Sequence, residues 1–297
     1  MRYVALTEAK SGMQLAKSLY DSNGRTLVGS HIMLTDNYIE KLIAYGYAGA
    51  YIEDALTQDI EVEDAISPQL RAEGMGCIER RDIDGCKLVA EKLVEEIMSK
   101  GRISLDMLDL RSYDDYTYAH SMNVGVLCGV IGMEMHMNEK EIAQLVMAAL
   151  LHDLGKLSVP NEILNKPGRL TQKEYKRMQE HPVMSYELIK DRFDISAQIK
   201  VAVLFHHENV DGTGYPNGVM GDEQTLFTKI IHAADVYDAL VSKRPYKEPY
   251  APCEAAEYLM GGCGILFDQE VVEIMLRAIP LYPKGTEVEL SDGRVGI

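Results

Sequence analysis

The stretch EKEIAQLVMAALLHDLGK, residues 139–156, joins a helical pattern to a pair of potentially functional side chains. Asn138 and Glu141, three residues apart, predict a capping box at the start of this helix. Helical spacing then predicts a buried stripe of Ile142, Leu145, Val146 and Ala149. The stripe continues to His152 and Asp153, just before Gly155, so we expect this pair to face the core. A buried Asp is costly unless it is paired or bound to a cation, which indicates a functional site.

Four other segments place a His or an Asp on an apolar helical face in the same way. They are His120 before Val124, Leu127, Cys128 and Ile131; His181 with Tyr175 and Met178, behind a Thr171–Glu174 capping box; His206 and His207 with Ile199 and Val203; and Asp235 and Asp238 with Ile231 and Ala234. A single buried His is usually a hydrogen-bonded core residue, but five helices of this kind favour a shared polar site. His31, His136 and His232 are not part of such a pattern, and we interpret them as structural or surface residues.

The residue types of this set indicate a metal centre. Imidazole and carboxylate ligands without thiolate suit Fe, Mn, Ni, Co or Zn, and they disfavour structural zinc. The candidate ligands are His120, His152, Asp153, His181, His206, His207 and Asp235. Seven ligands are too many for one ion, so the set predicts two ions that share one bridging carboxylate.

The rest of the sequence predicts a mainly α protein with small β segments at both ends. Apolar residues recur at helical spacing from Cys86 to Ile97, and helical periodicity dominates to about Leu281. Residues 14–28 predict a hairpin around Asn23-Gly24, residues 37–45 a short helix and residues 48–52 a strand, followed by an acidic connector at 54–67. Residues 284–295 predict a hairpin whose second strand is cut short. We therefore expect an α+β module of unknown role at 1–66, a helical domain at 67–281 and a short β tail at 282–297.

Composition narrows the classes of partner. With 46 acidic and 30 basic residues, the net charge is -16, which opposes binding to DNA, RNA or an anionic membrane. The sequence has neither an apolar run of about eighteen residues nor a signal-peptide stretch. Its five cysteines include no CxxC pair, which indicates reduced thiols and a cytoplasmic protein. The amphipathic helix from Cys86 could pair with a second copy, which leaves a homodimer open.

Three motifs, in order, carry a resemblance to a known family. They are HDLGK at 152–156, HHE at 206–208 followed by DGTGYP at 211–216, and ADVYDALVSKRPYK at 234–247. Together they closely resemble the HD-GYP family of the HD superfamily, over roughly residues 113–279. The resemblance implies an HD-type all-helical catalytic bundle with its core at 113–279. It also implies hydrolysis of cyclic di-GMP, a bacterial second messenger.

The resemblance also implies roles for individual residues. One metal would be held by His120, His152, Asp153 and Asp235, and the second by Asp153, His181, His206 and His207. Lys156 matches a lysine beside the scissile phosphate, and Asp238, Arg244 and Lys247 match positions that contact the nucleotide. Tyr215 lies in a loop at the rim of the site, where stacking on a base and covering the core are equally open. Some members hold a third metal through a glutamate four residues before the first histidine; Tyr116 stands there, which favours two metals, and Asp115 keeps the alternative open.

These observations predict a metal-dependent cyclic di-GMP phosphodiesterase that yields linear pGpG, GMP or both by means of metal-bound hydroxide. Asp153 and Lys156 are the expected catalytic residues, and the expected cofactors are two divalent ions, Fe or Mn first, with Ni, Co or Zn as alternatives. Two other functions remain open. One is an HD-superfamily phosphohydrolase of another nucleotide or cyclic dinucleotide, and the other is an inactive module that binds a cyclic dinucleotide. All seven ligand positions are intact, which favours an active enzyme.

Overall fold

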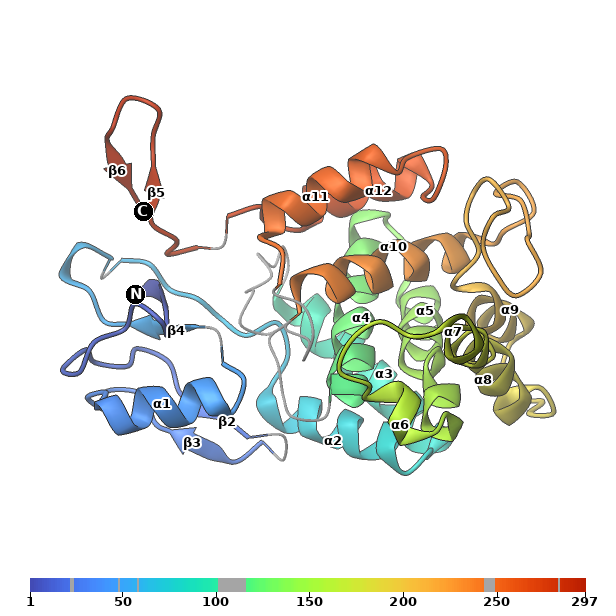
Figure 1. Ribbon diagram of the computed structural model, residues 1–297, viewed down its shortest axis with the longest axis horizontal. Coiled ribbons are helices and arrows are strands. Elements are labelled where there is room, and N and C mark those ends of the chain that lie inside the picture. Colours follow the sequence, from blue (N-terminus) through green and yellow to red (C-terminus); the bar gives the residue numbers. More distant parts are fainter. Residues whose placement is uncertain (22–23, 48, 58, 101–115, 243–248, 283) are drawn as a thin grey trace.

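The computed structural model describes residues 1–21, 24–47, 49–57, 59–100, 116–242, 249–282 and 284–297. Within these ranges most of the regular structure is helical, and a helical bundle lies beside small two-stranded sheets (Figure 1). The mainly α class expected from the sequence is confirmed. None of the helices in the described ranges is long and apolar enough to span a membrane.

Among the described residues, the bundle consists of α-helices and a short 3-10 helix, η2. In chain order its elements are α2 (Pro68–Glu79), α3 (Ile83–Lys100), α4 (Tyr116–Glu134), α5 (Glu139–Leu151), η2 (Leu154–Ser158), α6 (Asn161–Leu164), α7 (Gln172–Met178), α8 (His181–Ile189), α9 (Ala197–Phe205), α10 (Leu226–Val241), α11 (Pro252–Gly261) and α12 (Gln269–Ala278). Helix α4 is central, because it packs against α2, α3, α5, α10 and α12. Its residues from Ala119 to Gly132 are all buried, as expected for a mostly apolar helix at the centre of a bundle.

Most local predictions for the bundle are confirmed. The capping boxes at Asn138 and Thr171 are both present. Helix α3 buries the predicted stripe of Cys86, Val89, Ala90, Leu93, Val94 and Ile97. Two helix ends differ from the prediction. Helix α5 ends at Leu151, so His152 is its C-cap, and α7 ends at Met178, so His181 starts α8 and does not share a face with Tyr175.

The N-terminal residues form a small α+β unit with its own core. Strand β1 (Arg2–Ala5) pairs antiparallel with β4 (Gly49–Ile52), and β2 (Leu19–Tyr20) pairs with β3 (Thr26–Val28) as the expected hairpin. Helix α1 (Asp36–Ala44) starts at the N-cap Thr35. Apolar side chains from all these elements form a cluster separate from the bundle core. A 3-10 turn, η1 (Ala55–Thr57), begins the connector to α2.

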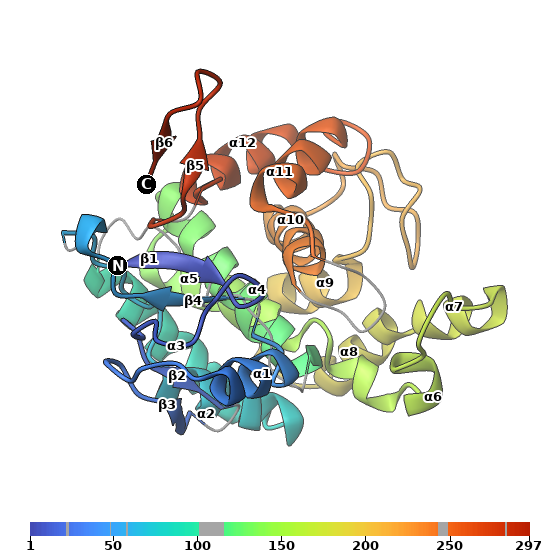
Figure 2. The same ribbon diagram turned by 60° about the vertical axis from the view of Figure 1, so that its left-hand side comes forward.

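The C-terminal segment returns to this N-terminal unit. The Tyr3 N–H of β1 donates to the Gly285 carbonyl at 2.8 Å, and Arg2 pairs with Glu287 at 2.6 Å. Strands β5 (Val288–Glu289) and β6 (Val295–Gly296) then form the predicted terminal hairpin. The two ends of the chain therefore lie close together, on the side of the bundle away from α8 and α9 (Figures 1 and 2).

Candidate metal centre

Three histidines of the centre are oriented by the ends of helices. His152 and His206 are the C-caps of α5 and α9, and His181 is the first residue of α8. Their Nδ1 atoms lie 2.6, 2.8 and 2.7 Å from the carbonyls of Ala149, Val203 and Met178, each three residues earlier. A carbonyl can only accept, so each Nδ1 is the donor and Nε2 is the ring nitrogen that is left to face the centre. These bonds also provide partners for carbonyls in the last turns of α5, α7 and α9, which helix ends leave without an intrahelical donor.

His120 is oriented by a carboxylate from another helix. Its Nδ1 donates to Oδ2 of Asp238 on α10 at 2.7 Å, and its Nε2 lies 2.9 Å from Oδ1 of Asp235, one turn earlier on α10. Both carboxylates and the imidazole are buried. A carboxylate at Nδ1 is a common partner of a metal-binding His, because it fixes the ring orientation and increases ligand basicity.

Asp153 lies between two groups of histidines. Its Oδ2 is 3.5 Å from Nε2 of His120 and 3.3 Å from Nε2 of His152. Its Oδ1 is 3.1 Å from Nε2 of His181 and 3.9 Å from Nε2 of His206. The two oxygens of one carboxylate therefore face different sets of imidazole nitrogens.

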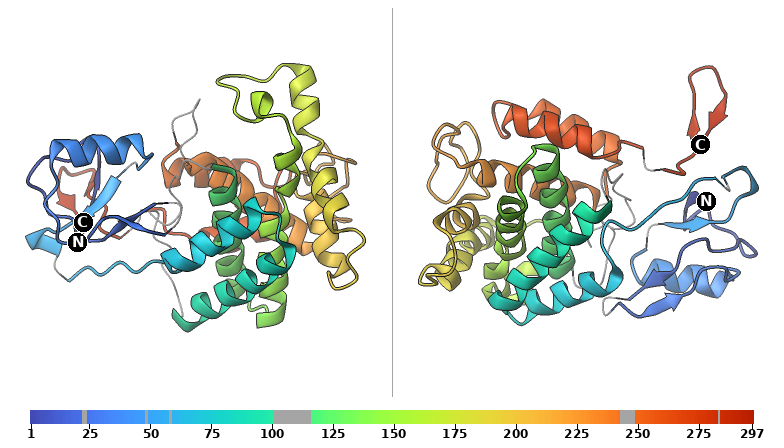
Figure 3. Two further views of the ribbon diagram at one scale, coloured as in Figure 1. Left: turned by 90° about the horizontal axis from the view of Figure 1, so that it is seen from below. Right: turned by 180° about the vertical axis from the view of Figure 1, so that it is seen from behind.

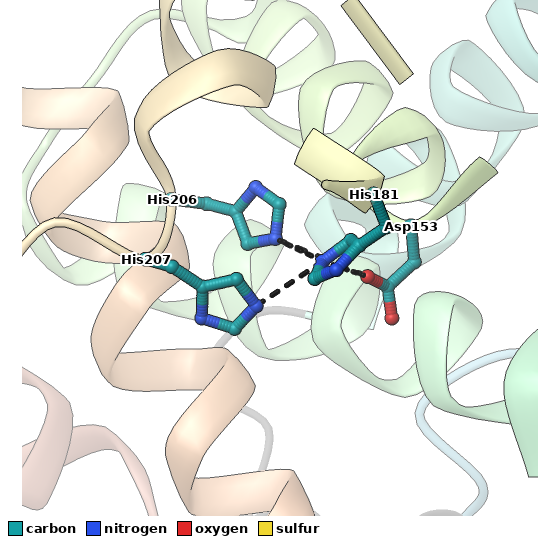
Figure 4. A group of neighbouring side chains, drawn as sticks. All are labelled: Asp153, His181, His206 and His207. Atoms are coloured by element: carbon teal, nitrogen blue, oxygen red, sulfur yellow. Dashed lines mark hydrogen bonds and ion pairs between the residues drawn. The ribbon is translucent and has the colours of Figure 1, made fainter. Parts of the chain in front are cut away.

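Two groups of side chains have the geometry of metal sites. In the first, Asp153, His181, His206 and His207 offer ligand atoms that all lie within 4.8 Å of one another, and the same holds for His120, His152 and Asp235 in the second. Figure 4 shows His206 and His207 pointing at His181 and Asp153 from one side. The two groups contain every ligand that the sequence predicted, and their residue types indicate divalent metal binding.

The electrostatics of the centre fit a cation. Burial holds the pKa of both His206 and His207 well below its usual value, and neighbouring imidazoles add to the effect, so both rings are neutral. Burial opposes ionisation of Asp153, but His152 and Lys156 outweigh it and hold the Asp153 pKa well below its usual range. Nε2 of His206 and of His207 each lie 3.2 Å from Nε2 of His181, and Nε2 of His152 has no hydrogen-bond partner among the described residues. Facing lone pairs beside a buried carboxylate are the donor set of a divalent transition metal.

Gly155 and Lys156, the last two residues of the HDLGK motif, each make a contact that explains their residue type. A Cβ on Gly155 would lie 2.1 Å from the His181 carbonyl oxygen, so only glycine lets η2 approach the start of α8. The Gly155 N–H donates to Oγ of Ser185 on α8 at 2.7 Å, which holds the two segments together. Lys156 lies one turn after Asp153, and its Nζ donates to Asp153 Oδ2 at 2.5 Å. The Lys156 side chain is 17% exposed, so it is accessible from outside the centre while it contacts the carboxylate.

Glu208 anchors the loop that contains Gly214-Tyr215-Pro216, which we call the GYP loop. No role was predicted for Glu208 from the sequence. Its carboxylate is fully buried and accepts from the backbone N–H groups of Asn217, Gly218 and Val219 at 2.7, 3.0 and 3.1 Å. A charged residue next to two predicted ligands in HHE was a usable signal, but its partners lie about ten residues further on. His232, interpreted as structural, donates from Nδ1 to the His206 carbonyl at 2.9 Å.

Tyr215 lies against His207, a candidate ligand of the centre. Its ring stacks on His207, with centroids 4.7 Å apart and an interplanar angle of 26°. Two glycines before it occupy positions where a side chain would be strained or would clash. Gly212 has a φ of 76°, and a Cβ on Gly214 would lie 2.4 Å from the His207 carbonyl oxygen. Burial, followed by the nearby Asp235, raises the pKa of the Tyr215 phenol, which therefore stays neutral.

Several predicted residues have other surroundings or cannot be placed. Asp238, expected to contact the nucleotide, is fully buried, and its carboxylate accepts from His120, from Asn123 at 2.9 Å and from Ser242 at 3.1 Å. Arg244, Lys247 and Asp115 lie outside the described residues, as does the side chain of Tyr116. Their predicted roles, and the choice between two and three metals, stay predictions.

Comparison with known proteins identifies the family. The sequence pattern described as HD domain matches residues 104–271, more than half of the chain. This chain belongs to the HD domain family. The chain is 35% identical over 212 residues to the cyclic di-GMP phosphodiesterase PA4108 of Pseudomonas aeruginosa, an alignment that covers 70% of this chain and 51% of that protein. It is 36% identical over 168 residues to a protein of Vibrio cholerae named 3'3'-cGAMP-specific phosphodiesterase 3, covering 57% and 36% of the two chains.

Relatives of this kind confirm the resemblance to the HD-GYP group. The chain spans about half the length of the curated relatives it matches, with 51%, 44% and 48% of the first three covered. A solved structure described as Bd1817, a HDG"Y"P protein from Bdellovibrio bacteriovorus, superposes with a TM-score of 0.59 at 14% identity. It covers 92% of this chain and 97% of that one, so the fold of the HD domain and its attached segments has a precedent.

Proposed function

We propose that this HD domain chain is a metal-dependent phosphodiesterase that hydrolyses cyclic di-GMP to linear pGpG, to GMP or to both. The names of its relatives support the substrate class. The observation that carries the proposal is the position of Asp153, whose two carboxylate oxygens face two different groups of His ligands. A bridging carboxylate between two cations is the arrangement of many enzymes that cleave phosphate esters.

We propose that two ions bind, with Fe or Mn as first candidates and Ni, Co or Zn as alternatives. One would be held by His120, His152, Asp153 and Asp235, and the other by Asp153, His181, His206 and His207. Such ions, when bound, activate water at neutral pH and offset the charge of the phosphodiester. The neutral state of His206 and His207 supports this, because only a neutral imidazole can ligate.

Around the ions, the chain's own side chains bind and orient the substrate. Lys156 has three N–H donors, so it can hold Asp153 and still donate to a phosphate oxygen. We propose that Lys156 stabilises the charge that develops on that phosphate and assists proton transfer at the leaving oxygen. Tyr215, neutral and stacked on His207, would form one wall of the substrate site. Arg244 and Lys247 are proposed contacts to the dinucleotide.

Metal analysis and hydrolysis of cyclic di-GMP test the proposal together. Protein purified anaerobically should carry two transition-metal ions per chain and convert cyclic di-GMP to a linear product. Asp153→Ala should lose metal and reduce hydrolysis to the level of the blank, because it removes a ligand of both ions. Asp222→Ala, an exposed Asp in the loop after GYP, is the matched control and should behave as wild type. A wild type without transition metal, or a full complement in Asp153→Ala, would contradict the proposal.

A second substrate is favoured by one finding. Relatives named as 3'3'-cGAMP-specific phosphodiesterases match this chain at 36% identity, close to the 35% of the cyclic di-GMP enzyme. The metal centre contacts phosphate, which the two dinucleotides share, so it does not discriminate between them. Parallel assays with cyclic di-GMP and 3'3'-cGAMP, compared as kcat/KM, distinguish the two substrates. Binding of either one without product by the metal-loaded protein would instead favour an inactive binding module.

A further inference from the structure

Helix α2 supplies a buried arginine, Arg71, that the proposed reaction does not use. The residue is 4% exposed, although arginine is rarely buried so fully unless it is paired. Its Nη1 donates to Oδ1 of Asn123 on α4 at 2.7 Å, whereas Nη2 has no hydrogen-bond partner in the described part of the chain. Withdrawing a guanidinium from water for an amide contact is costly, which points to a role beyond packing.

The Arg71 contact fixes the direction of the Asn123 amide. A guanidinium can only donate, so the amide atom that faces Arg71 is the oxygen. The amide nitrogen then faces Asp238 on α10 and donates to its Oδ1 at 2.9 Å. A reversed amide would place its oxygen against the Asp238 carboxylate and leave two acceptors facing each other. Arg71 therefore favours the one orientation of Asn123 that supports Asp238.

Asp238 in turn orients His120, a proposed metal ligand. Its Oδ1 accepts from Asn123 and Ser242, which leaves Oδ2 to accept from Nδ1 of His120 at 2.7 Å. Arg71, Asn123, Asp238 and His120 are each at most 4% exposed, so water competes little for these bonds. We call Arg71, Asn123 and Asp238 the polar network. It crosses the bundle from α2 through α4 to α10, and α4 packs against both of the other helices (Figures 1 and 3).

We infer that Arg71 is a positioning residue for the half of the metal centre that contains His120, and that it acts through Asn123 and Asp238. The inference rests on the proposed function, because it concerns one of the two ions proposed there. Helix α2 ends at Glu79, before residue 104 where the match to the HD domain family begins. Part of the metal centre is therefore set by a helix outside the matched domain.

Titration of the metal-free protein with Mn²⁺ tests the inference without any assay of activity. The wild type should show two sites by calorimetry and a coupled pair of ions by electron paramagnetic resonance. Arg71→Met should weaken one site by roughly 10- to 100-fold and leave the other unchanged, as losses of groups behind metal ligands typically do. Arg71→Lys should restore part of the affinity, because an ammonium can still donate to Asn123. Glu73→Gln is the matched control on the exposed face of α2 and should bind as wild type.

A double variant shows whether Arg71 affects Mn²⁺ binding through His120. In His120→Ala, which lacks that ligand, adding Arg71→Met should cause no further change in Mn²⁺ binding. Equal weakening of both sites by Arg71→Met, or a lower unfolding temperature with both affinities intact, would overturn the inference and leave Arg71 a packing residue. A wild type that binds no Mn²⁺ would instead contradict the proposed function on which the inference rests. A wild type with two sites, unchanged in Arg71→Met, would contradict the inference alone.

Discussion

His120, His152, His181 and His206 are each oriented by the acceptor at Nδ1. For His152, His181 and His206 the acceptor is a backbone carbonyl three residues earlier, which local helix geometry provides. For His120 it is Asp238, a residue 118 positions away in sequence. The local acceptors follow from where a histidine stands at a helix end, but the distant carboxylate depends on how α4 and α10 pack.

The raised pKa of His120 predicts that metal binding releases a proton. In the metal-free protein, burial disfavours the charged form, but hydrogen bonds to Asp235 and Asp238 outweigh it and raise the His120 pKa to about 9. His120 therefore holds a proton at pH 7 that a cation must displace. We expect Mn²⁺ binding to release about one proton from His120 at pH 7, falling to zero above a pH of about 10. Calorimetric titrations in buffers of different ionisation enthalpy measure this release.

The raised pKa of His120 also makes the stability of the metal-free protein depend on pH. Because the folded pKa lies above the unfolded value of about 6.5, the proton on His120 stabilises the metal-free fold fully below that pH. The contribution is lost as the pH rises through about 9. His120→Gln should remove both the proton release and this part of the pH dependence of unfolding. Binding heats that do not depend on the buffer in the wild type would show that His120 is already neutral.

Gly214 is a position where a single methyl group should matter. A Cβ there would lie 2.3 Å from the Asn209 nitrogen and 2.4 Å from the His207 carbonyl oxygen. We expect Gly214→Ala to displace the turn after His207, to lower stability by about 1–3 kcal/mol and to impair metal binding. Gly261→Ala is the matched control, since a Cβ there meets nothing within 4 Å. Denaturant unfolding and metal content measure both variants, and equal behaviour of the two would contradict the prediction.

At the scale of elements, short loops and helix ends build the centre. Helices α5, α9 and α8 present His152, His206 and His181 at their ends, where the chain turns away. Only His120 and Asp235 project from within helices, α4 and α10. A ligand at a helix end can be placed with less constraint from the helical repeat, which explains why an extended apolar stripe was an incomplete guide there.

The loop after α9 depends on one buried carboxylate. Glu208 accepts three backbone N–H groups, and Glu208→Gln would turn an amide N–H₂ toward at least one of these donors. We expect the variant to lose about 1–3 kcal/mol of stability and to exchange backbone hydrogens at Asn217–Val219 faster than wild type. Hydrogen exchange measured by mass spectrometry checks this. Glu223→Gln, exposed in the same loop, should show wild-type exchange, and unchanged protection in Glu208→Gln would refute the anchoring role.

At the scale of the whole molecule, the described residues form two separate hydrophobic cores. One fills the bundle, and the other fills the N-terminal unit. The C-terminal segment binds back to the N-terminal unit through Tyr3 and Arg2, so the two ends of the chain form one body beside the bundle. The sequence predicted two separate terminal pieces, at 1–66 and 282–297, and these domain boundaries stay a prediction.

Separate cores predict separate responses to core mutations. Leu15 is fully buried in the N-terminal unit, and Leu15→Ala should destabilise that unit by about 2–5 kcal/mol while the metal content stays unchanged. Leu150→Ala, equally buried in the bundle core, should lower both stability and metal content. Denaturant unfolding followed by metal analysis compares the two variants. Metal loss in Leu15→Ala equal to that in Leu150→Ala would mean that the cores unfold as one.

The helical class, the stripe on α3 and the seven candidate ligands could all be predicted from the sequence. Periodicity reports which face of a helix is buried, and a His or Asp on that face is conspicuous because burial of such groups is costly. The division of the ligands into two groups with Asp153 between them agrees with the resemblance to the HD-GYP family, but its geometry became visible only in the fold.

Other features depended on tertiary packing. Asp238 faces His120, Glu208 faces Asn217, and Arg71 faces Asn123 across 52 residues of sequence. A periodic pattern identifies the buried side of one helix and contains no information about which side chain of another helix lies opposite. The candidate ligands were therefore predictable from residue type and spacing. The groups that orient His120 from other helices were not, because Arg71 and Asp238 are brought into place only by the packing of α2 and α10 against α4.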